Sequence, residues 1–438
     1  MLKFFYFAAF KLMAVMAFGQ SALLIRNAEI FNGKDATTTR GHVLVEGNEI
    51  QKVSSAEITP PEGCTIIDAN GRFLMPGMID AHYHTMLAGI PQQLVMMGDL
   101  SLVALYAGKN AGEVLMRGFT SVRDLGGPSF GLKKAIDAGV VQGPRIWPSG
   151  AMISQTAGHG DFRMPYEIPH DESRGLTISE RLTVGVIADG ADAVLKRTRE
   201  QLLMGASQIK LMAGGGVSSL YDPLDAVQYT PQEIRAAVQA AENWGTYVTV
   251  HAYTPESMRM AIEAGVKCID HGQLVDEDVA KLMAQKGVWW SLQVFLDDED
   301  ANPKKDAFSR MKQKAVSTGT DQAYQLAKKY KIKTAWGTDA LFDIHTARKQ
   351  NKILAKLERW YTPYEILKMV THDNAQLLAL SGERSPYYGK LGVIEEGALA
   401  DFILIDGNPL QDIQHIVEYE ERFVLIVKDG KVFKNRVE

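Results

Sequence analysis

Two histidines separated by one residue, His82 and His84, are the first side chains in this sequence whose spacing suits metal binding. They end the stretch GMIDAHYH, whose apolar character predicts a β-strand. Side chains at positions i and i+2 of a strand project from the same face, about 6.6 Å apart along it, so both imidazoles can converge on one ion. A single His-x-His pair is common by chance, so further ligands are needed to support a metal site.

Other side chains of metal-binding type also stand at the ends of predicted strands. They are Lys210, His251, His271 and Asp339. In a TIM barrel the active site lies at the carboxyl ends of the strands, so side chains at these ends share one mouth. The six residues together therefore predict a metal centre.

The elements that must position these residues lie between about Met78 and Gly382, where short apolar runs alternate with helical patterns. Eight strands are predicted, with the sequences GMIDAHYH, TSVRDLGG, RIWPSGAMI, QIKLMAGGG, YVTVHAY, CIDHG, VWWSLQV and TAWGTDA. One intervening helix is predicted from Pro231, with Thr230 as its N-cap and Gly245 at its end. Eight strands within about 300 residues favour an α/β fold of the TIM (β/α)8 type over an open doubly wound sheet. No G-x-G-x-x-G motif follows the first strand to support dinucleotide binding.

Antiparallel β-structure is predicted at both ends of the chain. The first segment contains LLIRNAEIFNG and HVLVEGNEIQKV, and the last contains ADFILIDGNPL and RFVLIVKDGKVFKN. Neither segment has enough residues to close a core alone, so the two are expected to pair into one small β-sandwich. The predicted organisation is a β-sandwich made from residues 20–78 and 385–438, with the TIM-barrel domain inserted at 79–384.

The composition of the chain excludes some classes of function. The 438 residues carry a net charge of −5, and no block of Lys and Arg suits nucleic acid. Cys64 and Cys268 are the only cysteines, which excludes a cysteine-based zinc cluster. Two free thiols are expected, although the sequence alone leaves one isolated disulfide open.

The first residues predict export from the cytoplasm. An apolar run is followed by the small-x-small pattern Ala17-Phe18-Gly19, which suits signal-peptide cleavage before Gln20. The expected leader is therefore 1–19, and the mature protein is expected in the periplasm or secreted. An uncleaved anchor and a wrongly assigned start codon are the alternatives. No other stretch reaches the roughly 18 apolar residues of a membrane helix.

The order H-x-H, Lys, His, His, Asp on the first, fourth, fifth, sixth and eighth predicted strands resembles the binuclear amidohydrolase superfamily. PGMIDAHYHT resembles its first-strand motif, and GALADFILIDGNPL resembles its returning β-sandwich strand. TSVRDLGG, SQTAGHGDFR and IKLMAGGGV are similar to the imidazolonepropionase-related branch, which contains Xaa-Pro dipeptidases and other metallocarboxypeptidases. The resemblance covers nearly all of the chain after the leader.

This resemblance implies two divalent metal ions, with zinc as the first choice. One ion would be held by His82, His84 and Asp339 and the other by His251 and His271. Lys210 would capture carbon dioxide, and its carbamate would bridge both ions, because an unmodified ammonium would repel them. From the sequence alone, Lys210 can also be an ordinary barrel lysine paired with an acid.

Hydrolysis by a hydroxide that two metal ions share needs no protein nucleophile, and no G-x-S-x-G motif is present. Asp339 would accept the proton of the hydroxide and pass it to the leaving amine. His159, in a glycine-flanked loop, could orient the carbonyl oxygen or a substrate carboxylate, or simply hydrogen-bond within its loop. Tyr229 resembles the tyrosine that contacts the free carboxylate of a dipeptide in this branch.

Two other features carry structural expectations. Arg123 and Asp124 could tie the second strand to its neighbours. The acidic stretch FLDDEDANPKKDAF, residues 295–308, could form a rim or lid over the site, although such stretches are usually solvated loops. His42 and His415 lie in or near the predicted sandwich and are expected at the surface.

The leading hypothesis is a metal-dependent hydrolase of dipeptides, Xaa-Pro first, or of N-acyl amino acids. Cyclic amide hydrolysis or deamination of the imidazolonepropionase type is the enzymatic alternative, but Lys210 argues against it because such enzymes usually use one metal. A catalytically silent binding protein of the same fold is the third hypothesis, and such a protein should lack ligands. The expected partner is a small-molecule or dipeptide substrate, and a homo-oligomer stays open.

Overall fold

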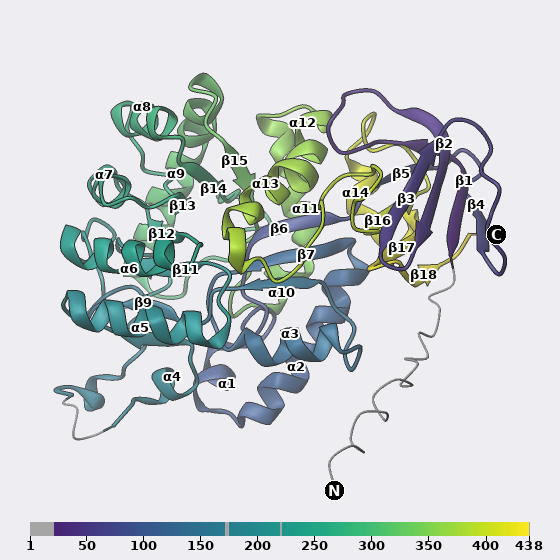
Figure 1. Ribbon diagram of the computed structural model, residues 1–438. Helices are drawn as coiled ribbons and strands as arrows, with labels where there is room; N and C mark the ends of the chain where they lie inside the picture. Colours follow the sequence, from purple (N-terminus) through teal and green to yellow (C-terminus); the bar gives the residue numbers. More distant parts are fainter. Residues whose placement is uncertain (1–21, 171–174, 220, 438) are drawn as a thin grey trace, which may run out of the picture.

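The computed structural model describes residues 22–170, 175–219 and 221–437. It contains a β-sheet at one side of the molecule and a larger region of parallel strands and helices at the other (Figure 1). The predicted leader, 1–19, lies outside the described residues, and its cleavage stays a prediction. Within the described parts of the chain, no helix combines the length and apolar character needed to cross a membrane.

Strands from both ends of the chain form one eight-stranded sheet. Its strands are β1 (Leu23–Ile30), β2 (Thr39–Glu46), β3 (Glu49–Ser54), β4 (Thr65–Asp68), β5 (Phe73–Pro76), β16 (Phe402–Ile405), β17 (Phe423–Lys428) and β18 (Lys431–Asn435). The order is β18-β17-β16-β5-β1-β2-β3, with β4 beside β1. The first and last segments meet where β5 pairs antiparallel with β16, which sets Met75 opposite Ile403. Figure 1 shows the purple and yellow strands side by side accordingly.

The strands between these segments are parallel and form two sheets. Their bounds are β6 (Met78–Tyr83), β7 (Phe119–Asp124), β8 (Arg145–Pro148), β9 (Met152–Ser154), β10 (Gly185–Ile187), β11 (Ile209–Met212), β12 (Val248–Ala252), β13 (Cys268–His271), β14 (Trp289–Leu292) and β15 (Thr334–Trp336). One sheet has the order β6-β7-β8 and the other β10-β9-β11-β12-β13-β14-β15. A single parallel bridge, Tyr83 to Ala340, links the start of the first sheet to the end of the second. Across the described residues, the ladders therefore do not form one closed barrel.

The third predicted strand, RIWPSGAMI, is wrong as a single element. It divides into β8 and β9, which belong to different sheets. Gly150 between them has a φ of 74°, a left-handed conformation that interrupts an extended strand. Its carbonyl instead accepts a hydrogen bond from Gly127 N at 3.1 Å. The parallel strand β10, which pairs with β9, was not predicted.

Helices connect and cover the parallel strands, and Figure 1 shows α5 to α8 along their outer side. The longer helices are α2 (Leu100–Met116), α3 (Ser129–Asp137), α5 (Ala191–Met204), α6 (Pro231–Asn243), α7 (Pro255–Glu263), α8 (Glu277–Lys286) and α9 (Ala307–Lys329). The shorter ones are α1 (Gln92–Met97), α4 (Ile178–Arg181), α10 (Ile344–Arg348), α11 (Gln350–Ala355), α12 (Pro363–Lys368), α13 (Asn374–Leu378), α14 (Gln414–Val417) and α15 (Tyr419–Arg422).

Helix α6 begins and ends where the sequence predicts. The Thr230 side chain accepts a hydrogen bond from Glu233 N, and the Glu233 carboxylate accepts one from Thr230 N at 2.7 Å. Such a cap stabilises a helix by about 1 kcal/mol. Pro231 is the first helical residue, and Gly245, with a φ of 70°, follows the last turn. These local rules are sufficient to define the helix.

Buried charge joins the two regions of the molecule. Arg145 of β8 donates to Asp401 at 2.9 Å and to Asp429 at 2.8 Å, both near the C-terminal strands.

Cys64 and Cys268 are free, as expected. His42 is buried in β2 at 5% exposure, so the expectation that it lies at the surface is wrong. Its Nε2 lies 4.0 Å from Glu57 Oε1.

Candidate metal centre

Three of the six predicted ligands converge at the end of β6. His82 Nε2 and His84 Nε2 each lie 3.2 Å from the same oxygen, Asp339 Oδ1. One ligand atom from each of the three side chains can be chosen so that all lie within 4.8 Å of one another. Both histidines are buried, whereas the Asp339 side chain is 20% exposed. The group could hold a metal ion and opens toward solvent on the Asp339 side.

The backbone around this group explains why it forms. Asp80 is fully buried, and its carboxylate accepts hydrogen bonds from His82 N at 3.0 Å and Thr338 N at 3.1 Å. It therefore clamps the ends of β6 and β15 together. Gly337 permits this approach, since a Cβ there would come within 2.2 Å of His82 N. Asp339 has a φ of 53°, a conformation that costs energy for a residue with a side chain and clusters at functional sites.

The other three predicted ligands lie on β11, β12 and β13. Lys210, His251 and His271 are all buried. The ring centroids of His251 and His271 lie 4.5 Å apart, and those of His271 and His82 lie 4.9 Å apart. All four histidines thus share one interior region.

Each of the four imidazoles has one ring nitrogen next to a protein oxygen. His84 Nδ1 lies 3.2 Å from Gly126 O, His251 Nε2 lies 3.1 Å from Gly215 O, and His271 Nδ1 lies 2.7 Å from Gln293 Oε1. His82 Nδ1 lies 3.5 Å from Asp270 Oδ1. When these nitrogens donate their protons to the oxygens, the second nitrogen of each ring keeps a lone pair. This is the arrangement that metal-bound histidines use.

Lys210 pairs with an acid that the sequence analysis did not single out. Its Nζ lies 2.6 Å from Asp270 Oδ2, and both side chains are fully buried. Arg123 of β7 donates to the other oxygen, Asp270 Oδ1, at 2.6 Å and to Ala81 O at 2.5 Å. The expectation that Arg123 ties its strand to neighbours is confirmed, and Arg123 also remains a counterion for Asp270 if Lys210 loses its charge.

The protonation preferences differ between the histidines. Burial lowers the pKa of His251 and of His271 well below the ordinary value. Burial also disfavours charge on His82, but the carboxylates of Asp339 and Asp270 together outweigh it and raise the pKa of His82. Although burial opposes ionisation of Asp339, the neighbouring His82 and His84 hold its pKa well below the usual range. His251 and His271 are therefore neutral at ordinary pH, and Asp339 is ionised.

His159 lies against the second group of ligands. Its ring stacks on that of His251, with centroids 4.1 Å apart. His159 Nδ1 lies 2.8 Å from Ser219 Oγ, and that hydroxyl also bonds Asp222. Gly216 allows the ring to sit there, because a Cβ at this position would come within 1.9 Å of it. His159 is thus both locally hydrogen-bonded and adjacent to the centre.

Tyr229 lies in the apolar core before α6. It is 5% exposed, and its hydroxyl has no hydrogen-bond partner among the described residues. Its φ of 66° is unusual for an aromatic residue. A buried hydroxyl without a partner is costly, so a polar ligand group would stabilise it.

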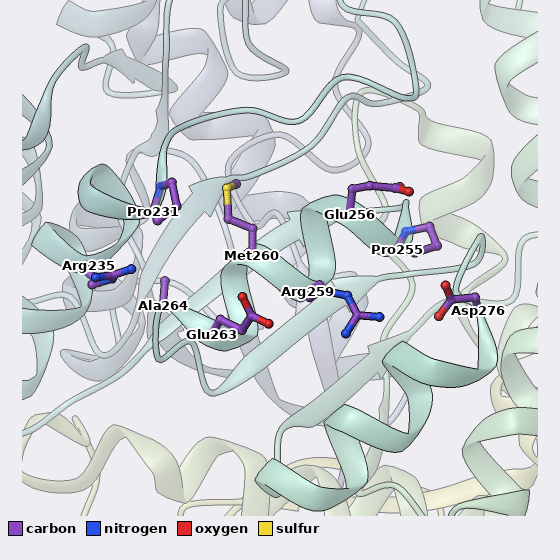
Figure 2. Close-up of a pocket in the computed structure, with 9 residues that line it drawn as sticks. All are labelled: Pro231, Arg235, Pro255, Glu256, Arg259, Met260, Glu263, Ala264 and Asp276. Carbon is purple, nitrogen blue, oxygen red and sulfur yellow. The ribbon is translucent and has the colours of Figure 1, made fainter.

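A cavity of about 160 Å³ opens beside Asp339. Its lining includes Tyr253, Thr338 and the loop after β14. A second pocket, drawn in Figure 2, lies between α6, α7 and the start of α8 and has a volume of about 340 Å³. Its described lining contains none of the six predicted ligands, so the first cavity is the one that serves the centre.

Comparison with known proteins identifies the family. The model of the Amidohydrolase family matches residues 73–433, which is most of the chain. The chain belongs to the amidohydrolase family. It is therefore a hydrolase, and members of this family generally bind divalent metals.

Three relatives illustrate the range of the family around this chain. The ochratoxinase of Aspergillus niger is 32% identical over 82% of this chain and 75% of its own length. A prolidase solved with N-methylphosphonate-L-proline is 32% identical, with a TM-score of 0.87, over 95% of this chain and 100% of its own. A Xaa-Pro dipeptidase solved with bound methionine is 27% identical, with a TM-score of 0.80, over 95% of this chain and 100% of its own. All three names describe amide-bond hydrolases.

The donors of this amidohydrolase fit divalent ions. Imidazole nitrogens and a carboxylate oxygen are ligands that zinc accepts, and the hydrogen-bonded second nitrogens orient the rings. Sequence reasoning missed the residues that do this orienting, among them Asp270 and Gln293. One signal was available for Asp270: a charged residue inside an otherwise apolar strand needs a buried partner.

Proposed function

We propose that this amidohydrolase cleaves the amide bond of dipeptides, with Xaa-Pro dipeptides first, or of N-acyl amino acids. The observation that carries the proposal is the convergence of His82 and His84 on Asp339. The prolidase, Xaa-Pro dipeptidase and ochratoxinase relatives support it, because an amide substrate is common to them. We further propose that residues 79–384 form a TIM-barrel domain whose strands lie in the two sheets joined by the Tyr83–Ala340 bridge. We also propose that the protein is exported after loss of 1–19.

The proposed cofactor is a pair of divalent ions, with zinc as the first choice. His82, His84 and Asp339 would hold one ion, and His251 and His271 the other. Lys210 would bridge them as a carbamate. For this it must give up its ion pair with Asp270, which would stay paired with Arg123. When bound, the ions supply Lewis-acid chemistry that polarises the amide carbonyl and lowers the pKa of water.

The protein residues have separate roles in the proposed reaction. Asp339 is ionised and partly exposed, so it can accept the proton of the attacking water at its carboxylate. The same proton then goes to the leaving amine. His159, stacked on His251, would orient the carbonyl oxygen or a carboxylate of the substrate, and the unpartnered Tyr229 hydroxyl would donate to a substrate carboxylate.

A second candidate has one specific observation in its favour. Cyclic amide hydrolysis or deamination with a single metal ion needs no bridging lysine, and Lys210 is paired with Asp270 at 2.6 Å. Under this alternative the lysine has a purely structural role. The two candidates therefore differ in the number of ions bound at full activity.

Metal analysis combined with a substrate screen tests the proposal. Protein loaded with zinc should contain two ions per chain and release amino acids from a library of dipeptides and N-acyl amino acids. Full activity with one ion would favour the second candidate. So would turnover restricted to hydrolysis of cyclic amides or to deamination of ring amines. Absence of any turnover with two ions bound would favour a binding protein.

A further inference from the structure

The loop after β11 carries a buried carboxylate that reaches His159 through a hydroxyl group. The Asp222 side chain is 1% exposed, and its Oδ1 accepts a hydrogen bond from the Ser219 hydroxyl. The oxygen of that hydroxyl lies 2.8 Å from His159 Nδ1. Asp222 Oδ2 lies 3.5 Å from the same nitrogen, which is longer than an ordinary hydrogen bond. Asp222 therefore acts on the ring through Ser219, and we call these three side chains the relay.

The other partners of Asp222 are donors, so its carboxylate is an acceptor throughout. Oδ2 accepts hydrogen bonds from Gly216 N at 2.8 Å and from Gln228 Nε2 at 3.2 Å. The orientation of the Gln228 amide is fixed, because its Oε1 accepts a hydrogen bond from the backbone N–H of His159 at 2.9 Å. Although burial opposes ionisation of Asp222, His159, Ser219 and Gly216 hold its pKa below the ordinary value.

These bonds set the direction of the relay. Ser219 has one hydroxyl proton and donates it to Asp222, since the alternative acceptor, Gly216 O, is 3.4 Å away. The Ser219 oxygen can then only accept from His159, so Nδ1 carries a proton. Among the residues that the structure describes, no protein group hydrogen-bonds His159 Nε2, and the side chain is 14% exposed. Nε2 is thus the ring nitrogen that a substrate can contact.

A buried lysine fixes the backbone of the relay. Lys312 of α9 is 2% exposed, and its Nζ donates to Ser219 O at 2.8 Å and to Asp222 O at 3.1 Å. At the other end of the relay, the His159 ring stacks on His251. The relay therefore has the fixed geometry that a positioning role requires.

We propose that Asp222 is a positioning residue that acts through Ser219, keeps a proton on His159 Nδ1 and directs Nε2 to the substrate. The proposal rests on the amide-hydrolase function above, in which His159 contacts the substrate. A hydrogen bond at one imidazole nitrogen decides which nitrogen carries the proton. Replacement of such a carboxylate by an amide produces the wrong tautomer even when the geometry is kept.

The variant D222N should reverse the relay. Gly216 N and Gln228 Nε2 both donate toward the Oδ2 position, so the carboxamide oxygen must take that position and its NH2 group must face Ser219. The Ser219 hydroxyl then accepts from the NH2 group and donates to His159 Nδ1, whose proton moves to Nε2. D225N makes the same chemical change on an exposed residue of the same loop and serves as the matched control.

A second pair of variants tests the hydroxyl and leaves the buried carboxylate intact. S219T and S219V have nearly the same shape and differ in a hydroxyl against a methyl group. S219T should keep the proton on His159 Nδ1. In S219V the nitrogen faces a methyl group and has no acceptor, so the proton should move to Nε2. Ser219 is partly exposed, which makes both changes easier to accommodate than a change of Asp222.

Nitrogen NMR of zinc-loaded protein with 15N-labelled histidine distinguishes a protonated from an unprotonated Nδ1. Signals that are missing from H159N identify His159, and a slightly alkaline buffer keeps free imidazole neutral. We expect a protonated Nδ1 in the wild type, D225N and S219T, and an unprotonated Nδ1 in D222N and S219V.

Kinetics provide a second readout. D222N should lower kcat/KM by about tenfold, as for loss of one hydrogen bond to the substrate, and D225N should match the wild type. The double variant H159N/D222N should be no slower than H159N, because the effects of residues in one hydrogen-bond network do not add.

Three results would overturn the inference. An unprotonated Nδ1 in the wild type would mean that the relay runs in the other direction. The same signal in the wild type and D222N, or additive losses in the double variant, would mean that Asp222 only stabilises its loop. Thermal unfolding midpoints show whether each variant is folded; if D222N is not, identical Nδ1 signals in S219T and S219V overturn the inference instead. Failure of the substrate screen with the tautomer change intact would reject the catalytic proposal alone.

Discussion

The two halves of the candidate metal centre differ in how far the protein alone assembles them. On the β6 side, His82 and His84 already point at one oxygen of Asp339. On the other side, Lys210 pairs with Asp270, while the rings of His251 and His271 meet edge to face. His251 also stacks on His159, and His271 on Tyr253. The first half is a converged ligand set, whereas the second contains the right residue types held by protein partners.

This difference shows which parts of the site depend on a chemical change. The first half needs only an ion. Under the proposed two-metal arrangement, Lys210 would exchange the Asp270 carboxylate for carbon dioxide, and Arg123 is positioned to keep Asp270 paired afterward. A buried acid left without any cation would be strongly destabilised, so Arg123 is what makes the exchange energetically feasible.

The largest effect is expected from D339N, which alters the converged half. The amide removes both the anionic ligand and the proton acceptor, so kcat should fall by about 10³-fold or more. Metal content should drop by one ion per chain. D297N makes the same chemical change on an exposed loop residue and should behave as the wild type. Turnover of D339N near the wild-type value would remove Asp339 from the mechanism.

The second-largest effect is expected from replacement of Lys210, which tests the half whose bridge would require carboxylation of this lysine. K210A should lower kcat by about 10²- to 10³-fold and retain the ion on the His82 side, because only the bridge is lost. Added short-chain carboxylic acids should restore part of the activity by supplying the missing carboxylate. Unchanged turnover would falsify the bridging role and support the one-metal alternative.

Lowering the pH should release the two metal ions one after the other. Protons compete with metal for each imidazole according to its pKa in the metal-free protein. The raised pKa of His82 is reached first as the pH falls, whereas the lowered pKa values of His251 and His271 are reached later. Metal analysis after dialysis at stepwise lower pH should show the ion on the His82 side leaving first. The H251N variant should bind only the ion on the His82 side, so its metal loss identifies that step. Simultaneous loss of both ions would contradict the order.

The smallest effect is expected from H159N, beside the second half. His159 stacks on His251 but is not among the proposed ligands, so both ions should remain bound. The ratio kcat/KM should fall by about tenfold, as for loss of one hydrogen bond to the substrate. Loss of an ion in H159N would instead identify His159 as a ligand.

Local rules predicted much of this molecule. The i and i+2 spacing of His82 and His84 was enough to place both rings on one face, and Thr230 and Pro231 were enough to define the start of α6. The pairing of the two chain ends followed from segments too short to form a core alone. Each of these inferences depends on residues that are close together in sequence or on how much apolar surface a segment can bury.

Features that depend on partners far away in the sequence were not predicted. Nothing near Asp270 in sequence indicates Arg123 or Lys210, which come from two other strands. The acidic loop after β14 has the composition of a solvated segment, yet Lys352 of α11 fixes Asp300, and Lys356 just after α11 fixes Asp298. Gly150 divides a strand because its left-handed backbone suits the junction of two sheets, which alternation of side chains does not reveal.

The pairing of β5 with β16 has a consequence for synthesis of the chain on the ribosome. Strand Phe73–Pro76 emerges long before Phe402–Ile405, which pairs with it. Until then its backbone amides and carbonyls on that side form an open edge, a surface that other chains can join. Completion of the eight-stranded sheet must therefore follow synthesis of the parallel region. Truncation just before β16 should leave a nascent chain that aggregates even when its catalytic region has folded.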